Sequence, residues 1–485
     1  MHRARLSAVL AAVLACAFLG SLDARDIHVN HERGDDESTG KRPLRTLAKA
    51  IGIAQPGDTI HLAKTKTPYR DSASFFNKSG APGRPIILDG HGATLCGSDA
   101  IVPEQWEEVS PGLYRCATLI KAPPSIAMRW YFVFGGTMSH MGRTSKGTKA
   151  PLKKPEELQP GEWTFVKDDN AFYIKIKPKK KLADYSIEAP MRANGVALHG
   201  DCNHIIIRNM TATHVWNDGY NIHGKTREVL FENITAIDCG DDGISAHGDC
   251  QIRVDGFVSM GNSTGMCHID NSSSVTDRAF VRGCLARDFT MIGSNTHVLT
   301  NSIIYADSER NIDVTGGKTP EEICTVRMEN VAVINRRKQP KPITIGRHAV
   351  FEAKRLTAYG LSFNVSGVAA KLFDSVIGGD PVPDIVLKST AKWTADKNVY
   401  GLNEFRIDDK NYSPKEFDAY RRATRQDKDS KWTRVEFKQP VTGEIKAPKL
   451  PKGVGADLAE LPGDPEEQTK GKRKKGRERR KKERR

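Results

Sequence analysis

The sequence predicts an all-β solenoid, in which short strands stack as repeated units along one axis. A His-Gly pair recurs every 24 residues, at His199, His223 and His247. The residues before each pair repeat as well, as Gly-Val-Ala-Leu, Gly-Tyr-Asn-Ile and Gly-Ile-Ser-Ala. A period of this length in β-rich segments indicates stacked units rather than one compact core. Abundant glycine and few helix-forming runs favour the same class.

A second strand repeats beside the first and ends at asparagine. Asn209 and Asn233 occupy the same phase of the repeat, and later strands end at Asn301 and Asn330. Asparagine tolerates left-handed backbone and can form a hydrogen-bonded ladder between stacked strands. We therefore expect a corner of each repeat at these positions.

The segment before the central repeat carries a family resemblance. An amphipathic stretch at 43–51 is followed by the Gly-Asp-Thr-Ile turn at 57–60 and by a strand pattern at 85–90. This order resembles the N-terminal entry of right-handed parallel β-helix proteins of the pectin-lyase-like superfamily. The resemblance implies a right-handed parallel β-helix with a short helix capping its first coil. The ordered motifs of polygalacturonases and the arginine motif of pectate lyases are absent, so the resemblance concerns the fold.

Residues 101–190 interrupt the repeat with aromatic, alternating strands. Gly161–Phe165 and Phe172–Ile176 flank the turn Asp168-Asp169-Asn170, which predicts a hairpin. The region is similar to the β-sandwich inserted between early coils in some secreted β-helix glycosidases. We therefore expect a small antiparallel insertion here.

The whole chain then divides into six predicted parts. Ser413-Pro414-Lys415-Glu416 is a capping-box sequence and predicts a short helix that covers the last coil. The parts are a signal peptide (1–24), an N-terminal cap with the first coils (25–100), the antiparallel insertion (101–190), the main β-helix (191–400), a C-terminal cap with a helix (401–439), and a linker with a basic tail (440–485).

Charge and the N-terminus indicate the compartment and the partners. A basic start and an apolar stretch ending near Ala24 are typical of a secretory signal peptide, so we expect a secreted, periplasmic or cell-surface protein. Residues 470–485 carry +10 of the net charge of +15. The body is therefore not a general polyanion binder, and nucleic acid is not an expected partner. The tail is either a solvated extension or an anchor on anionic cell-surface polymer. We expect a monomer.

Alternation along the strands places several polar side chains outward. Val196, Leu198 and their counterparts are apolar and predict the interior, so His199, His223 and His247 form an outward column. Matching Ile269 with Ala246 puts two more residues on the outside in the next coil. The predicted outward set beside the histidine column is Asn221, Ser245, His268 and Asp270.

Three aspartates precede the repeated glycines and suggest acid–base chemistry. Asp218 and Asp242 share one phase and stack in neighbouring coils, with Asp241 adjacent. Like charges at that spacing retain a proton or recruit a cation, so Asp218 and Asp242 are candidate metal ligands, with calcium as the candidate ion. Two carboxylates about 5–5.5 Å apart suit retaining glycoside cleavage. A carboxylate beside histidine can make the ring a general base.

These observations predict a carbohydrate-active protein that cleaves a glycosidic bond in a bound polysaccharide. The candidate catalytic residues are Asp218, Asp241, Asp242, His223, His247, His268 and Asp270, and the candidate substrate-binding residues are Trp216, Asn221 and Ser245.

Hydrolase and lyase activity remain open at this stage. One alternative is a non-catalytic glycan-binding surface protein, in which the His-Gly ladder serves only register and the aspartates cap turns. Copper handling is a weaker alternative, because Met-rich segments are missing.

Overall fold

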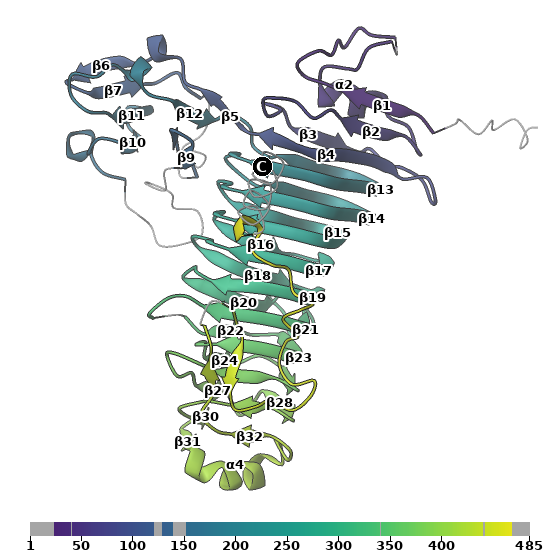
Figure 1. The fold of residues 1–485 in the computed structure, drawn as a ribbon, viewed down its shortest axis with the longest axis vertical. Helices are drawn as coiled ribbons and strands as arrows, with labels where there is room; N and C mark the ends of the chain where they lie inside the picture. The colour runs from purple at the N-terminus through teal and green to yellow at the C-terminus, as the bar shows by residue number, and fades with distance from the viewer. Residues whose placement is uncertain are drawn as a thin grey trace, which may run out of the picture.

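The computed structural model describes residues 24–39, 41–120, 129–138, 152–339, 341–439 and 442–467. A sheet of 24 strands runs the length of the molecule, and its strands stack as rungs along the long axis (Figure 1). Apart from Ala24, the expected signal peptide lies outside the described residues, and so do residues 470–485 of the basic tail. The described chain is thus all-β with a large parallel sheet, as the repeat predicts.

The first rungs are short strands with one helix over them. Helix α2 (Leu47–Ile53) begins after Thr46, whose Oγ1 accepts the Lys49 N–H at 3.2 Å, and it buries its apolar side. This is the helix expected within residues 43–51. The strands are β1 (Asp26–Val29), β2 (Thr59–Leu62), β3 (Ala73–Phe76) and β4 (Ile86–Cys96).

The three central rungs are long, and their His-Gly segments pair without a register shift. They are β13 (Val196–Thr213), β14 (Tyr220–Ile237) and β15 (Asp242–Met260). The parallel pairing sets His199 against His223 and His223 against His247, so the predicted histidine column is confirmed. The predicted interior is also confirmed, because the apolar residues on the other face have almost no exposed surface.

The asparagine corners form the expected ladder. Asn209, Asn233, Asn301 and Asn330 all have φ between 46° and 57°, the left-handed region. The Asn330 side-chain amide donates to Asn301 Oδ1 at 2.8 Å, and that of Asn233 donates to Asn209 Oδ1 at 3.4 Å. Each corner thus bends the backbone and ties one rung to the next.

Beyond β15 the rungs divide into separate strands. We call the column of strands that continues the His-Gly segments flank A; it comprises β3, the first residues of β13 to β15, and then β16, β18, β20, β22, β24, β27 and β30. The bounds are β16 (Thr264–His268), β17 (Ser273–Arg282), β18 (Arg287–Gly293), β19 (Asn295–Ala306), β20 (Arg310–Gly316), β21 (Cys324–Asn335), β22 (Ile343–Ile345), β23 (Ala349–Tyr359), β24 (Phe363–Val365), β25 (Ala369–Phe373), β26 (Val376–Gly378), β27 (Ile385–Leu387), β28 (Lys392–Asp396), β29 (Val399–Tyr400) and β30 (Phe405–Ile407).

Two antiparallel sheets interrupt the rungs between β4 and β13 and project to one side of the column (Figure 1). One orders its strands β10-β11-β7-β6 and the other β5-β12-β8-β9. The expected hairpin joins β10 to β11, and aromatic side chains fill the core beside it. The bounds are β5 (Ser98–Ala100), β6 (Glu107–Ser110), β7 (Leu113–Cys116), β8 (Val133–Phe134), β9 (Thr137–Met138), β10 (Trp163–Val166), β11 (Ala171–Lys175) and β12 (Ile187–Pro190).

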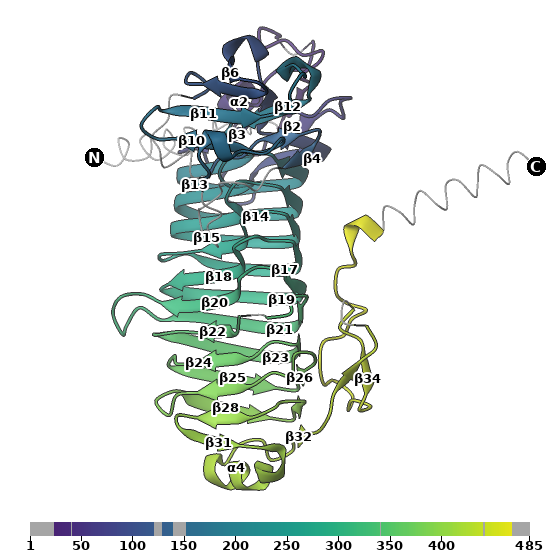
Figure 2. The same cartoon turned by 90° about the vertical axis from the view of Figure 1, so that its left-hand side faces the viewer.

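The far end of the column carries helix α4 (Phe417–Thr424), preceded by the expected capping box. Glu416 accepts the Ser413 N–H at 3.0 Å, and Phe417 and Tyr420 pack on the last rungs. The chain then returns alongside the column (Figure 2), where Arg282 pairs with Asp464. The remaining strands are β31 (Lys410–Tyr412), β32 (Lys431–Trp432), β33 (Glu436–Phe437) and β34 (Ile445–Ala447).

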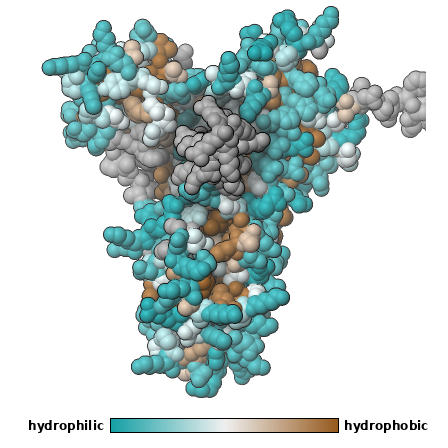
Figure 3. All heavy atoms as spheres, viewed as in Figure 1, coloured by the Kyte–Doolittle hydropathy of each residue, from teal (hydrophilic) through white to brown (hydrophobic). Residues whose placement is uncertain are grey.

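The surface is mostly hydrophilic in the view of Figure 3, with hydrophobic groups interspersed along the column. No helix in the described part of the chain has the length and apolar character that a membrane crossing requires.

Two histidines lie in the interior of the sheet. His268 is paired between Ala246 and Met291, and its ring stacks on His297 at 5.6 Å between centroids. Neither ring nitrogen of His268 has a hydrogen-bond partner among the described residues, while His297 Nδ1 lies 3.0 Å from Ser274 Oγ. Burial lowers the pKa of both rings, to about 4 for His297. Both histidines are therefore neutral in the folded protein near pH 7.

We expect this pair to make the fold sensitive to acid. Between pH 6.5 and pH 4 the unfolded chain binds a proton at His297 that the folded chain does not, so the free energy of unfolding falls as pH falls. For His297 alone the loss between pH 7 and pH 5 is about 2 kcal/mol. His268→Met, which matches the neighbouring Met291, should reduce the loss. Urea unfolding at the two pH values measures it.

The matched control is His28→Gln, because His28 is exposed. This variant should keep the pH dependence of the wild type. If His268→Met and the wild type lose the same free energy between pH 7 and pH 5, the buried ring is not a source of the acid sensitivity.

Candidate active site

The three aspartates of the sequence analysis meet at the start of flank A. Asp218 lies two residues before β14, Asp241 directly precedes β15, and Asp242 is the first residue of β15. One ligand oxygen from each lies within 4.8 Å of the others, and all three side chains are buried. Gly219 permits this arrangement, because a Cβ there would lie 2.7 Å from Ala236 Cβ. The stacked phase of Asp218 and Asp242 thus brings three carboxylates together, as the register predicts.

Asp218 is held by hydrogen bonds to both of its carboxylate oxygens. Its Oδ1 accepts the Asp242 N–H at 2.9 Å, and its Oδ2 accepts the Asn221 amide at 2.5 Å and the Ser245 hydroxyl at 2.7 Å. Asn221 and Ser245 lie on the outward side, as predicted, but they are buried and orient Asp218. Asp218 therefore acts as an acceptor that fixes the start of two rungs.

An arginine from the insertion reaches the cluster. Arg129 Nη1 lies 3.0 Å from Asp241 Oδ2 and donates to Asn217 Oδ1 at 2.6 Å. Nearby, Tyr131 OH donates to the Val215 carbonyl at 2.8 Å, so the insertion packs against the turn that carries Asp218. Sequence analysis missed Arg129. The one feature of the sequence that points to Arg129 is its position directly before an aromatic segment. No repeat or spacing relates this arginine to the aspartates.

Arg129 neutralises part of the negative charge in the cluster. Coulomb repulsion among three buried carboxylates disfavours their simultaneous ionisation, and one guanidinium offsets one of them. A site that holds one ionised and one protonated carboxyl group can carry out general acid chemistry beside a nucleophile.

The donor set does not fit the calcium ion expected at Asp218 and Asp242. Calcium takes six to eight oxygen ligands. The cluster supplies three carboxylates, and the Arg129 guanidinium beside Asp241 already offsets part of their charge.

The histidine column runs beside the aspartates on the same flank. The rings of His199 and His223 stack at 5.7 Å between centroids, and those of His223 and His247 stack at 4.2 Å with planes 6° apart. Burial lowers the pKa of His199. It also lowers the pKa of His223, an effect that His199 reinforces and that Asp218 and Asp270 oppose. Neutral, half-buried imidazoles of this kind can accept a proton.

The predicted place of His268 is wrong. Ala246 pairs with His268 rather than with Ile269, so His268 points into the interior and Cys267 takes the outward position beside Ser245. The rung from Asp242 to Thr264 is 22 residues long, two fewer than the central period of 24. Matching Ile269 with Ala246 had assumed that this rung is only one residue shorter than the period. A one-residue error exchanges the two faces of a strand.

Asp270 is exposed, and its Oδ2 accepts the Gly248 N–H at 3.0 Å, so it lies at the end of the histidine column and apart from the aspartates, as expected. Trp216 is half-buried and packs against the aromatic core of the insertion. The indole is therefore a contact between the insertion and the rungs, and its candidate role in substrate binding stays a prediction.

The comparisons with known proteins agree with this architecture. No family model and no curated protein matches the sequence. The solved structure of XylC in complex with xylose is similar over 84% of this chain and 86% of its own, with a TM-score of 0.50 and 12% identity. A glycoside hydrolase matches over 79% and 95%, with a TM-score of 0.43 and 11% identity. The GH136 lacto-N-biosidase from Eubacterium ramulus matches over 79% and 68%, with a TM-score of 0.28 and 10% identity.

At these identities the likeness concerns the fold. The chain is an all-β protein, and it shares its architecture with XylC over most of the length of both chains.

The contact between Arg129 and Asp241 predicts a measurable coupling. Arg129→Gln leaves a buried carboxylate without its cation and should lower the free energy of unfolding by about 1–2 kcal/mol, a range discounted because the arginine side chain is 40% exposed. Asp241→Asn in the same chain should restore part of the loss. Urea unfolding of both single variants and the double variant gives the coupling free energy.

The control is Arg115→Gln, which removes another arginine of the insertion that pairs with Asp169. Its effect should simply add to that of Asp241→Asn. Additive effects for Arg129→Gln and Asp241→Asn would contradict the contact.

Proposed function

We propose that this chain is a secreted glycoside hydrolase that cleaves a polysaccharide along flank A of a right-handed parallel β-helix of the pectin-lyase-like type. The observation that carries the proposal is the cluster of three buried carboxylates with one arginine beside it. The fold shared with XylC supports it. The sugar and the linkage are left to experiment.

Within the cluster, the charges assign different roles to the aspartates. Arg129 favours the ionised form of Asp241, which makes Asp241 the proposed nucleophile. Asp242, the neighbouring carboxyl group, is then the proposed general acid. Asp218 positions both through its bond to the Asp242 N–H and its bonds to the next rung.

The separation of the carboxylates favours a retaining reaction. Retaining enzymes hold their two carboxyl groups about 5–5.5 Å apart, whereas inverting enzymes leave about 6.5–9.5 Å for a water molecule. Oxygens of the cluster lie within 4.8 Å of one another. Asp242 would give its proton to the leaving oxygen while Asp241 bonds to the sugar carbon. Water would then release the sugar, with Asp242 taking the proton back.

The histidine column has a supporting role in this proposal. His223 and His247 lie on the same flank as the acids and would donate or accept hydrogen bonds with sugar hydroxyl groups. Asp270 at the end of the column would bind substrate rather than react with it.

A polysaccharide lyase is the second candidate, because arginines continue the row that holds Asp242. The pairing runs from Asp242 to Thr264, Arg287 and Arg310 along flank A. Cations in this row could neutralise the carboxylate of a uronic acid, and a neutral histidine could remove the proton beside it.

The remaining parts of the proposal rest on sequence. We propose secretion through residues 1–24, the six-part organisation with its insertion at 101–190, a monomeric state and contact of the basic tail with anionic cell-surface polymer. The rival proposal is a glycan-binding surface protein without catalysis.

A digestion screen tests the proposed hydrolase. The wild type should release products from at least one polysaccharide or aryl glycoside, aryl xylosides included, with retention of anomeric configuration by NMR. Asp241→Asn should abolish turnover. Asp242→Asn should lower it roughly 100- to 10,000-fold on polysaccharide and less on an aryl glycoside, whose leaving group needs no proton.

Asp270→Asn is the matched control, because it changes an aspartate of the same flank outside the cluster, and it should retain most turnover. Uronate polymers that yield an ultraviolet-absorbing unsaturated product would favour the lyase. Glycan binding without product from any substrate, unchanged in Asp242→Asn, would favour the binding protein.

A further inference from the structure

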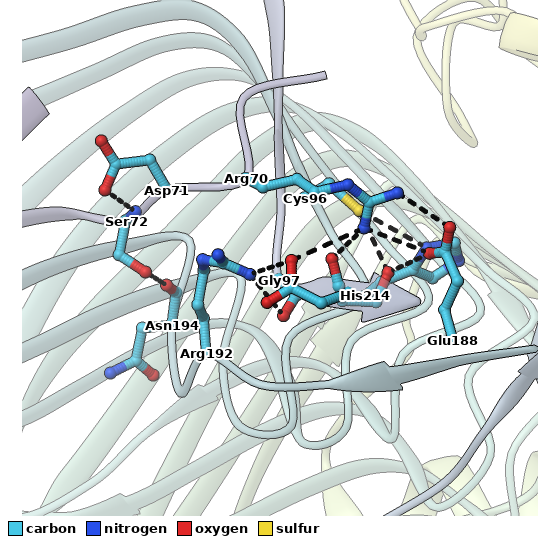
Figure 4. Close-up of polar contacts among 11 residues, drawn as sticks. Arg70, Asp71, Ser72, Cys96, Gly97, Glu188, Arg192, Asn194 and His214 are labelled. Atoms are coloured by element: carbon cyan, nitrogen blue, oxygen red, sulfur yellow. Dashed lines mark hydrogen bonds and ion pairs between the residues drawn. The ribbon is translucent and has the colours of Figure 1, made fainter. Parts of the chain in front are cut away.

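A second group of reactive side chains lies at the root of the insertion, away from the aspartates. Cys96, Glu188 and His214 each offer one ligand atom, and these atoms lie within 4.8 Å of one another. Figure 4 shows Arg70 reaching Glu188 beside Cys96 and His214. The Cys96 thiol is buried, and the other two side chains are half-buried.

The three residues come from segments far apart in the sequence. Cys96 ends β4, Glu188 lies in β12, and His214 follows the last residue of β13. β12 is the strand that returns the insertion to the rungs, and it pairs antiparallel with β5, which leaves them. The group therefore joins both ends of the insertion to two neighbouring rungs.

The backbone around the group is tightly fitted. A Cβ at Gly97 would lie 2.5 Å from Val215 Cγ1 and 2.6 Å from the His214 carbonyl oxygen, so only glycine allows this approach. His214 itself has φ of 53°, a left-handed conformation that turns its ring toward β4. Cys96 Sγ consequently lies 3.9 Å from His214 Nδ1.

Neighbouring groups orient the carboxylate. Arg70 Nη2 donates to Glu188 Oε1 at 2.8 Å, and Ser98 Oγ donates to Oε2 at 2.5 Å. Arg70 also lies 3.8 Å from Asp99, so its charge is shared between two carboxylates. Outer-shell hydrogen bonds of this kind hold the ligands of metal sites in place.

We propose that Cys96, His214 and Glu188 bind one zinc ion that clamps the insertion to the rungs. Sulfur and imidazole ligands select zinc over calcium or magnesium. Tetrahedral zinc holds such ligand atoms roughly 3.5 Å apart, close to the separation of Cys96 Sγ and His214 Nδ1, and water takes the fourth position. Binding releases the thiol proton to solvent, so zinc affinity falls at acid pH.

A catalytic thiol fits the same residues less well. A cysteine nucleophile needs its base within about 2.6–3.2 Å and a path to substrate. Here the thiol is 4% exposed and lies beyond that distance from the ring. The zinc clamp is independent of the proposed hydrolase, because none of its ligands belongs to the aspartate cluster.

Metal content and spectroscopy test the clamp in the full chain. After chelation and gel filtration, the protein should rebind one Zn²⁺ per chain by elemental analysis, and the melting temperature should rise with added zinc chloride. Co²⁺ in place of Zn²⁺ should give a thiolate-to-metal absorption band. Cys96→Ser should lose the band. His214→Asn, which retains a residue suited to left-handed backbone, should weaken binding more than the roughly 10- to 100-fold expected for an outer-shell change.

The matched control is Cys116→Ser, because Cys116 is another buried cysteine of the insertion region and lies outside the ligand group. It should bind zinc like the wild type. A wild type that binds no zinc, or a Cys96→Ser chain that keeps both the stoichiometry and the zinc-dependent rise in melting temperature, would overturn the proposal. If Cys96→Ser fails to fold, the cobalt spectra of the wild type and His214→Asn decide between the outcomes.

Discussion

Parallel hydrogen bonding in strict register is the constraint on which every other feature of this molecule depends. The His-Gly segments of the central rungs lie against one another with an offset of 24 residues, so identical positions superimpose there, and one register shift shortens the offset to 23 in the second half of β15. The superposition creates the apolar interior, the asparagine corners and the stacked histidines together. It also brings Asp218 beside Asp242, residues that would otherwise have no reason to meet.

The structural features that repeat from rung to rung could be predicted from the sequence. The period of the His-Gly pairs gave the interior residues, the outward column and the corners at Asn209 and Asn233, because alternation and stacking follow from backbone geometry alone. The short helix at 47–53 was predictable from the amphipathic stretch at 43–51 and from the family resemblance of that segment. The hairpin between β10 and β11 followed from its turn residues.

The features that do not repeat were beyond sequence reasoning. His268 is a polar residue that points inward, and its rung is shorter than the period of 24. The alternation of polar and apolar residues therefore predicted Ile269, rather than His268, as the interior partner of Ala246. Arg129 approaches Asp241 through the packing of a separate sheet, which no spacing encodes. Burial of Asn221 and Ser245 was also missed, since outward direction on a strand does not determine what covers it. The cluster was therefore predicted in composition but not in its electrostatic balance.

The rungs and the insertion contribute different parts of the aspartate cluster. The rungs place the carboxylates, and the insertion supplies the compensating guanidinium and covers the turn at Val215. The root of the insertion is in turn fixed against the rungs by Glu188, through Arg70 and Ser98. Small displacements of that root would change the distance between Arg129 and Asp241.

The rung length has a consequence for the evolution of such a chain. Each rung contacts only its neighbours, so gain or loss of one entire rung would leave the remaining faces in phase. Loss of one residue within a strand would instead exchange inside and outside for the rest of that segment. Duplication of whole units is therefore the easiest route by which this molecule could lengthen flank A. The loops between rungs absorb single-residue changes, as the shortened turn before Thr264 does.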